Sequence, residues 1–413
     1  MVENQLTQLE RALLGTYAHY GKITSMLAQA NPLDAGIASE YVEETKRRLA
    51  EIKTLESGLT GEGLNPVQAR LQKQVTLPYC NAVLRTLLAQ IDGATEGFKD
   101  SRKSYLIQLG MDGIPLDDTR NALEVYQIEV LRFFDLQKMC KGLKFPRVNP
   151  RNKDQYHRAC EAALFDSDEH ASELLGREIF TPVNINLRED MPHQFLGEIN
   201  IGFEDSYPNL VRLIYHEGSL GHNTQDRLTD DDSDLRIPFR HTQEGLAILG
   251  ERLGLEHKYG KNNGNSPIIE LLMSKRKVHD AFYAAFERMA YFERLPAREI
   301  AMMLRSRLYP QQALVQGLGR LDQARDVGVN CGATPYFVGA QAIQAIYLRA
   351  LEKINQTYTD ENDREMARRA LLRTMYTGHR PAFLVGREVD LSLEKKVDAE
   401  SRVKDVSRAS LGF

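Results

Sequence analysis

The chain has no tryptophan at all, and its 413 residues include only four cysteines. The cysteines show no paired spacing, which is typical of buried or free thiols in a reducing cytoplasm. No apolar run approaches the roughly 18 residues that a membrane-spanning helix needs. The net charge of −4 is small, so charge gives no indication of a nucleic-acid partner. The four cysteines are Cys80, Cys140, Cys160 and Cys331.

The first 25 residues are polar and mixed in charge, which argues against a signal peptide. We therefore expect a cytoplasmic protein. A chain of this length holds one large domain or two smaller ones and buries a sizeable core without crosslinks. Because the stretch 144–152 is basic and contains two prolines, we expect it to connect an N-terminal helical region, 1–145, to a catalytic helical region, 146–413. The two regions are expected to pack as one unit with a cleft.

Apolar residues recur at helical spacing over most of the chain, which predicts a mainly α fold. Asp117 or Asp118 is expected to cap one of these helices. Alternating apolar and polar residues at 183–187 and 197–203 predict a small hairpin or mixed sheet. The edge of such a sheet can receive an extended substrate, or the sheet can simply support the next helix. Helices before this sheet are expected at 6–27, 38–55, 66–91, 118–140 and 156–175.

Two histidines and two glutamates in the middle of the chain form a pattern that is typical of a catalytic metal site. His216 and Glu217 end an apolar helical run, and His222 and Glu244 follow. Two imidazoles and one carboxylate can hold zinc and leave a fourth position open for water. The pattern thus predicts His216, His222 and Glu244 as ligands. Glu217 is the expected base, because a spare carboxylate beside the metal can take the proton of that water.

The spacing of the two histidines requires a break in the helix. Residues six apart on a regular helix are rotated by about 600°, so their rings diverge by about 120° and lie about 9 Å apart along the axis. One ion cannot bind both rings in that arrangement. Gly218, Ser219 and Gly221 relax the intervening backbone or bond to it locally. We therefore expect a break or bulge within 218–221.

Each of these residues also has an ordinary structural interpretation. A histidine–glutamate pair on a helix is usually a surface pair, and a glutamate in an amphipathic helix is usually solvated. From these residues alone, two interpretations are open. The residues either form a metal site or are surface and solvated side chains that do not meet.

The order of these motifs resembles the bacterial family called domain of unknown function 885, whose members resemble helical zinc peptidases such as thimet oligopeptidase and carboxypeptidase Taq. That family carries His-Glu-x-x-Pro-Gly-His-His, then Glu-Gly-Trp-Ala-Leu-Tyr-x-Glu. This chain has HEGSLGHN at 216–223 and EGLAILGE at 244–251. Echoes of further motifs at 276–284, 325–339 and 378–381 extend the resemblance over roughly residues 195–395. The resemblance implies a large helical metallopeptidase-like fold with the same zinc ligands and base.

The departures from the family pattern fall on residues that would line the substrate pocket. Leu220 stands where the family has proline, Asn223 where it has a second histidine, and Leu246 where it has tryptophan. The ligands and the base are unchanged. This pattern favours metal chemistry on a particular small substrate over general peptide cleavage.

Two residues beyond the metal motif are candidates for catalysis. Tyr336 matches a tyrosine of the family and can donate a hydrogen bond to an oxyanion as it forms; its alternative is a packed tyrosine. Arg325 can neutralise the same oxyanion or bind a substrate carboxylate, and its alternative is a surface ion pair.

Three further residues have a more open interpretation. Asp280 either orients a zinc-bound histidine or forms a salt bridge with Arg276, one helical turn earlier. Arg240 and His241 lie shortly before Glu244 and can face the cleft.

We expect a zinc-dependent hydrolase that cleaves an amide bond in a short peptide or an amino-acid-derived metabolite. Iron or manganese suits a similar ligand set, so the native metal stays open. Two other hypotheses remain. One is a biosynthetic enzyme that uses the metal as a Lewis acid in a non-hydrolytic reaction on a small molecule, and the other is a non-catalytic helical scaffold with a degraded site. We expect neither a nucleic-acid nor a membrane partner, and a homo-oligomer is compatible with the sequence.

Overall fold

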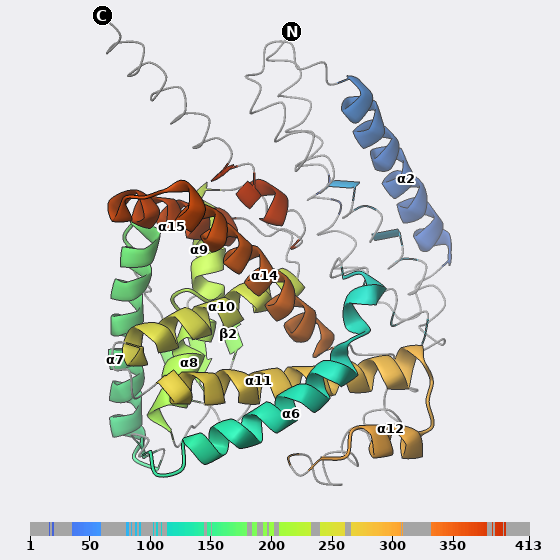
Figure 1. The fold of residues 1–413 in the computed structure, drawn as a ribbon. Coiled ribbons are helices and arrows are strands. Elements are labelled where there is room, and N and C mark those ends of the chain that lie inside the picture. Colours follow the sequence, from blue (N-terminus) through green and yellow to red (C-terminus); the bar gives the residue numbers. More distant parts are fainter. Residues whose placement is uncertain are drawn as a thin grey trace, which may run out of the picture.

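The computed structural model consists mainly of α-helices, which confirms the predicted fold class (Figure 1). The structure describes residues 35–58, 114–143, 147–149, 151–179, 184–187, 193–195, 198–201, 206–232, 240–260, 266–306, 332–377 and 385–390, with single positions between them. The helices expected at 6–27 and 66–91 fall outside these ranges. Every helix within them is too short or too polar to cross a membrane.

The described helices before the sheet are α2 (Ala35–Gly58), the 3₁₀ turn η2 (Leu116–Thr119), α6 (Ala122–Met139) and α7 (Lys153–Leu175). Those after it are α8 (Tyr207–Glu217), α9 (His222–Asp232), α10 (Arg240–Tyr259), α11 (Ser266–Glu287), the π-helical turn η3 (Arg288–Phe292), α12 (Ala297–Met303), α14 (Thr334–Thr357) and α15 (Glu361–Tyr376).

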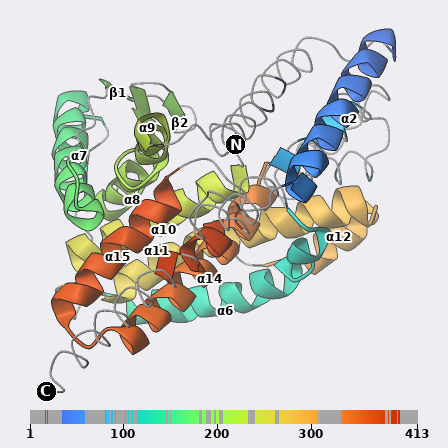
Figure 2. The same cartoon turned by 90° about the horizontal axis from the view of Figure 1, so that it is seen from above.

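Helix α10 lies at the centre of this arrangement. It packs against α8, α9 and α11, and its pairing with α14 is the most extensive among the described elements. Figures 1 and 2 show α14 crossing between α15 and the layer that α11 and α6 form. Different faces of α10 therefore contact different helices. Side chains on α10 can meet side chains from α8, α9, α11 and α14.

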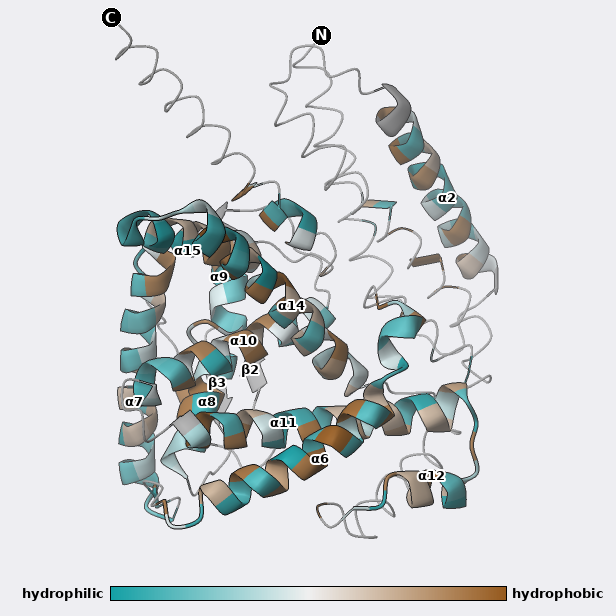
Figure 3. Ribbon diagram, in the orientation of Figure 1, coloured by the Kyte–Doolittle hydropathy of each residue, from teal (hydrophilic) through white to brown (hydrophobic). Residues whose placement is uncertain are grey.

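Two apolar clusters hold the helices together. The first lies among α7, α8, α10, α14 and α15 and includes Leu210, Ile214 and Leu249. The second lies between α6 and α11, where the rings of Tyr126 and Phe282 are 5.4 Å apart. Figure 3 shows brown, hydrophobic residues where α6 and α11 face each other and hydrophilic residues along α15. Because α6 lies before residue 145 and α11 after it, the two predicted regions share a core; the boundary itself stays a prediction.

The start of α6 differs from the expectation. Its N-cap is Asn121, and neither Asp117 nor Asp118 caps it, because both aspartates lie in the preceding 3₁₀ turn. The two aspartates therefore belong to a separate turn before the helix. The spacing of apolar residues does not distinguish this turn from the start of the helix.

A small mixed sheet precedes α8, one of the two forms expected. It contains β1 (Asn184–Leu187), β2 (His193–Phe195) and β3 (Glu198–Ile201) in the order β1-β3-β2, and the third strand, β2, was not predicted. β1 is parallel to β3, with Ile185 opposite Ile199, and β2 is antiparallel to β3. Since β3 contacts α8, the sheet supports the helix that carries His216. A role for its edge in substrate binding stays a prediction.

Helices α10 and α14 cross at two glycines. A Cβ atom on Gly245 would lie 2.4 Å from the carbonyl oxygen of Gly339, and one on Gly339 would lie 1.8 Å from the carbonyl oxygen of His241. Only glycine fits at such distances, because any side chain would overlap the facing backbone. The crossing brings Tyr336, one turn before Gly339, to the same place as Glu244.

We expect Gly339→Val to push α10 and α14 apart. The added side chain meets backbone, which cannot move aside easily, so the free energy of unfolding should fall by about 1–3 kcal/mol. Chemical denaturation measures this loss. Gly386→Ala is the control, because its Cβ would meet Ile346 at an ordinary 3.4 Å. A valine variant as stable as the wild type would show that the close crossing is not required.

Candidate metal centre

The helix breaks where the histidine spacing requires it. Helix α8 ends at Glu217 and α9 begins at His222, so the predicted break within 218–221 is confirmed. Gly218 ends α8 with φ −101° and ψ −124°, and Leu220 has a positive φ of 65°. Proline is locked near φ −65° and cannot adopt this angle. The backbone of this turn therefore excludes proline at position 220.

Side chains from three elements hold this turn. The Leu220 amide donates to Oγ1 of Thr224 at 2.9 Å, and the Tyr376 hydroxyl of α15 donates to the Leu220 carbonyl at 2.7 Å. The Ser219 hydroxyl donates to the Asp168 carboxylate of α7. The chain folds back so tightly that a Cβ on Gly221 would lie 1.9 Å from the carbonyl oxygen of His216. The two histidines are thus brought together by a fixed backbone rather than by flexible side chains.

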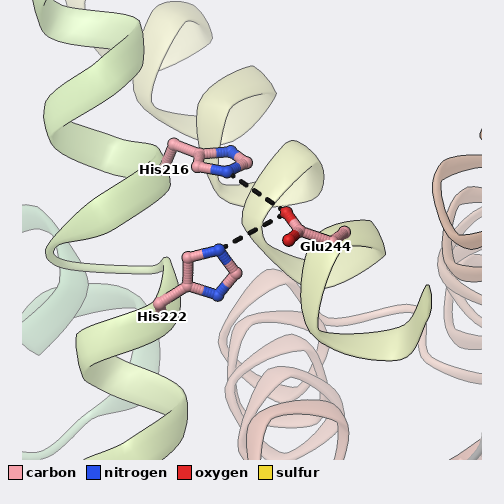
Figure 4. A group of neighbouring side chains, drawn as sticks. All are labelled: His216, His222 and Glu244. Atoms are coloured by element: carbon pink, nitrogen blue, oxygen red, sulfur yellow. Dashed lines mark ion pairs between the residues drawn. The ribbon is translucent and has the colours of Figure 1, made fainter. Parts of the chain in front are cut away.

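His216, His222 and Glu244 converge on one point (Figure 4). Their ligand atoms lie within 4.8 Å of one another. Oε2 of Glu244 is 3.3 Å from Nε2 of His216 and 3.4 Å from Nε2 of His222. Bonds of about 2.0–2.1 Å from a tetrahedral zinc would separate neighbouring ligand atoms by about 3.3–3.4 Å. The separations of Glu244 from each imidazole are therefore those of neighbouring zinc ligands, and the two imidazole nitrogens lie within 4.8 Å of each other.

The three side chains are also electrostatically coupled. Burial alone would raise the pKa of Glu244, but the two imidazoles hold it well below its usual range. Burial alone would lower the pKa of His216, but Glu244 and a second carboxylate, Glu251, raise it to about 9. A proton on His216 and a metal ion therefore compete for this imidazole, as is usual for a metal-binding histidine.

Glu251 orients the first histidine. Its Oε1 lies 2.8 Å from Nδ1 of His216, 3.0 Å from a guanidinium nitrogen of Arg212 and 3.7 Å from one of Arg276. Burial would raise the pKa of Glu251, but the two arginines and His216 lower it to about 2. A carboxylate on the far nitrogen of a metal-binding histidine fixes the ring and strengthens it as a ligand. The sequence holds one indication of this role that was not used. Glu251 follows Glu244 by seven residues, which places both glutamates on one face of α10.

Asp280, the other candidate for orienting a histidine, forms the salt bridge instead. Its carboxylate pairs with Nε of Arg276 at 2.9 Å and lies 3.2 Å from Nδ1 of His279. His279 is not among the three converging residues. Of the two interpretations that the sequence left open for Asp280, the structure favours the ion pair.

Tyr336 lies beside the three converging residues. Its ring is nearly parallel to that of His216, at 6.3 Å between centroids, and the guanidinium carbon of Arg276 lies 4.9 Å from its centroid. Burial and the carboxylate of Glu244 raise the pKa of Tyr336, while Arg276 acts in the opposite direction. Its phenol is therefore protonated at neutral pH and can donate a hydrogen bond.

The first turn of α14, which carries Tyr336, is fixed by a buried carboxylate. Glu287, the last residue of α11, accepts from the amides of Ala333 and Thr334 at 2.9 Å each and from the Thr334 hydroxyl at 2.6 Å. Burial raises the pKa of Glu287 to about 7 despite these donors. Sequence reasoning missed this contact, because the two segments are far apart along the chain.

The remaining candidates differ in their placement. Glu217 is buried at the end of α8, and its charge helps to raise the pKa of His216. Arg240 lies at the edge of the site, with Nε 4.0 Å from Oε1 of Glu244. His241 is turned to the backbone, since its Nε2 accepts from the amide of Ala382 at 3.1 Å. Arg325 lies outside the described residues.

Comparisons with known proteins give no functional information. No protein family and no curated protein matches the chain. It aligns with a solved structure described as a "putative lipoprotein of unknown function" from Shewanella oneidensis, at 12% sequence identity and a TM-score of 0.45. The alignment covers 92% of this chain and 77% of that one. A likeness this weak supports no conclusion, so any functional proposal depends on the site itself.

We expect Glu251→Gln to weaken metal binding although Glu251 is not a ligand. The variant removes the charge that holds the His216 ring and leaves Arg212 and Arg276 without their shared partner. Zinc affinity, measured by competition with a chelating dye, should fall by about 10–100-fold. Asp280→Asn is the matched control, since it removes a carboxylate that holds Arg276 but touches no ligand, and its effect should be much smaller. Equal losses in both variants would count against the orienting role of Glu251.

Proposed function

We propose that this protein is a metal-dependent hydrolase that cleaves an amide bond in a short peptide or an amino-acid-derived metabolite. The observation that carries the proposal is the convergence of His216, His222 and Glu244, with the Glu244 carboxylate 3.3–3.4 Å from each imidazole. Zinc is the metal that this set of two imidazoles and one carboxylate suits best, and it would polarise the carbonyl and acidify a water. Iron or manganese suits a similar set.

Glu217 is proposed as the general base. It follows a ligand directly, it is buried, and it belongs to none of the three converging positions. In the proposed reaction its carboxylate takes a proton from the attacking water and passes it to the departing amine nitrogen. The carbon–nitrogen bond breaks, a carbon–oxygen bond forms, and an amine and a carboxylate result.

Tyr336 is proposed to stabilise the oxyanion of the tetrahedral intermediate. Its raised pKa keeps the phenol protonated, and its ring lies beside that of His216, which supports this role. A donor fixed where negative charge develops lowers the barrier more than it tightens substrate binding. Arg276 above its ring limits the movement of this side chain.

We expect the ligands and the base to respond differently to substitution. His216→Ala, His222→Ala and Glu244→Ala should each abolish stoichiometric metal, because two remaining ligands hold zinc poorly. Glu217→Gln should keep the metal and lose nearly all turnover. Metal analysis of each variant, prepared without chelator, gives the first result, and an assay over peptides and acylated amino acids gives the second. Wild-type protein without stoichiometric metal would favour the scaffold hypothesis, and full activity of Glu217→Gln would remove this residue from the mechanism.

Tyr336→Phe tests the oxyanion donor. The change deletes one hydroxyl and little volume, so kcat should fall by about 10²–10³ while KM changes modestly. Steady-state kinetics on the best substrate measures both constants. Tyr283→Phe, on α11, is a control for loss of a tyrosine hydroxyl elsewhere. An unchanged kcat would reduce Tyr336 to a packing residue.

A further inference from the structure

A cavity of about 90 Å³ is lined by residues of α6, α10, α11 and α14, the four helices that pack together in Figure 1. None of the three converging residues of the candidate metal centre lines it. A single water molecule needs roughly 10–15 Å³ of such space, so the cavity has room for a small organic molecule. The lining reaches solvent, because the side chains of Arg132 and Lys277 are 49% and 44% exposed.

Every carboxylate oxygen in the lining of this cavity already has a partner. The carboxylates that line it are those of Glu129, Glu270 and Asp280. These carboxylates therefore offer little to a ligand that donates hydrogen bonds, such as an amine. The groups that contact their oxygens belong to Lys277, Ser274, Arg132, Arg252, Arg276 and His279.

The donors of the lining, in contrast, have capacity left. An arginine carries five N–H donors, and Arg132 and Arg252 each direct only two of their three guanidinium nitrogens at carboxylates. The amide nitrogen Nε2 of Gln341 is buried and has no hydrogen-bond partner among the described residues. Four cationic side chains and three carboxylates line the cavity, so the charge of the lining is positive. The cavity therefore favours a ligand that accepts hydrogen bonds and carries negative charge.

The rest of the wall is largely apolar and includes Ile248, Met273 and Phe337. We propose that the cavity binds a small organic anion, whose carboxylate or phosphate head group meets Gln341 and the arginine donors and whose short apolar part packs against this wall. Charge-assisted hydrogen bonds from guanidinium groups to oxyanions are strong, so the head group should dominate the affinity. The inference goes beyond the proposed hydrolase, because it uses neither the metal nor the base.

The test compares small anions with an uncharged analogue of similar size. Calorimetry on the full wild-type chain measures the Kd values of butyrate, propyl phosphate and butyramide. At least one of the two anions should bind about 10-fold or more tightly than butyramide, and the tighter one identifies the head group. If neither anion binds more tightly than butyramide, the proposal is wrong.

Gln341→Leu tests where the anion binds. The variant removes an amide nitrogen that has no partner among the described residues, so the protein should fold as before. The Kd of the preferred anion should nevertheless rise about 10-fold or more. Gln356→Leu is the matched control, because this glutamine lies on the same helix but not in the lining. Should thermal denaturation show that Gln341→Leu does not fold, Ala340→Leu replaces it, because it narrows the cavity without changing its charge.

A variant of the candidate metal centre separates this site from the metal. An anion bound to a metal ion would be lost in His222→Ala, whereas an anion in the cavity should bind this variant as well as it binds the wild type. Loss of binding in His222→Ala, or an unchanged Kd in the cavity variant, would overturn the proposal. Binding that persists in His222→Ala and weakens in the cavity variant supports the site, whether or not the protein hydrolyses any substrate.

Discussion

The candidate centre depends on one break in one helix. A continuous helix through residues 210–224 would point His216 and His222 in different directions, and no third ligand could repair that. The break uses a residue with positive φ, Leu220, and a hydroxyl from the distant α15, that of Tyr376. The positions of the two imidazoles are therefore set by tertiary structure. A local sequence motif is enough to allow the break but does not fix its geometry.

Helix α10 combines the remaining parts of the site through simple helical periodicity. Glu244 faces the two imidazoles, and Glu251, two turns later, reaches the far nitrogen of His216. Gly245 permits the close crossing with α14 that brings Tyr336 to the same place. A change in the path of α10 would thus move a ligand, an orienting carboxylate and a proposed oxyanion donor together. This shared support makes the site rigid, which is what a preorganised donor needs.

Sequence reasoning reached the parts of this site that short-range geometry determines. The histidine spacing was enough to predict the break, and alternation was enough to predict two strands, β1 and β3, of the sheet before α8. It did not reach the roles that depend on which helices meet. Asp280 was the candidate partner for a histidine, but Glu251 is the carboxylate beside Nδ1 of His216, because α8 packs on α10. The contact of Glu287 with the first turn of α14 joins residues 47 apart in sequence, and no local pattern records it.

The buried charged side chains around His216 are not explained by a contribution to the stability of the fold. Glu244, Glu251 and His216 are all buried, and Arg276 lies against them. Removing such groups from water is costly, and buried ion pairs often contribute no more than well-packed apolar residues would. The fold gains little from placing two carboxylates and an imidazole side by side in its interior. A divalent ion bound by His216, His222 and Glu244 would change this balance, because it supplies positive charge beside the buried carboxylate of Glu244. The cost of the cluster is thus an independent physical argument for a metal-binding role.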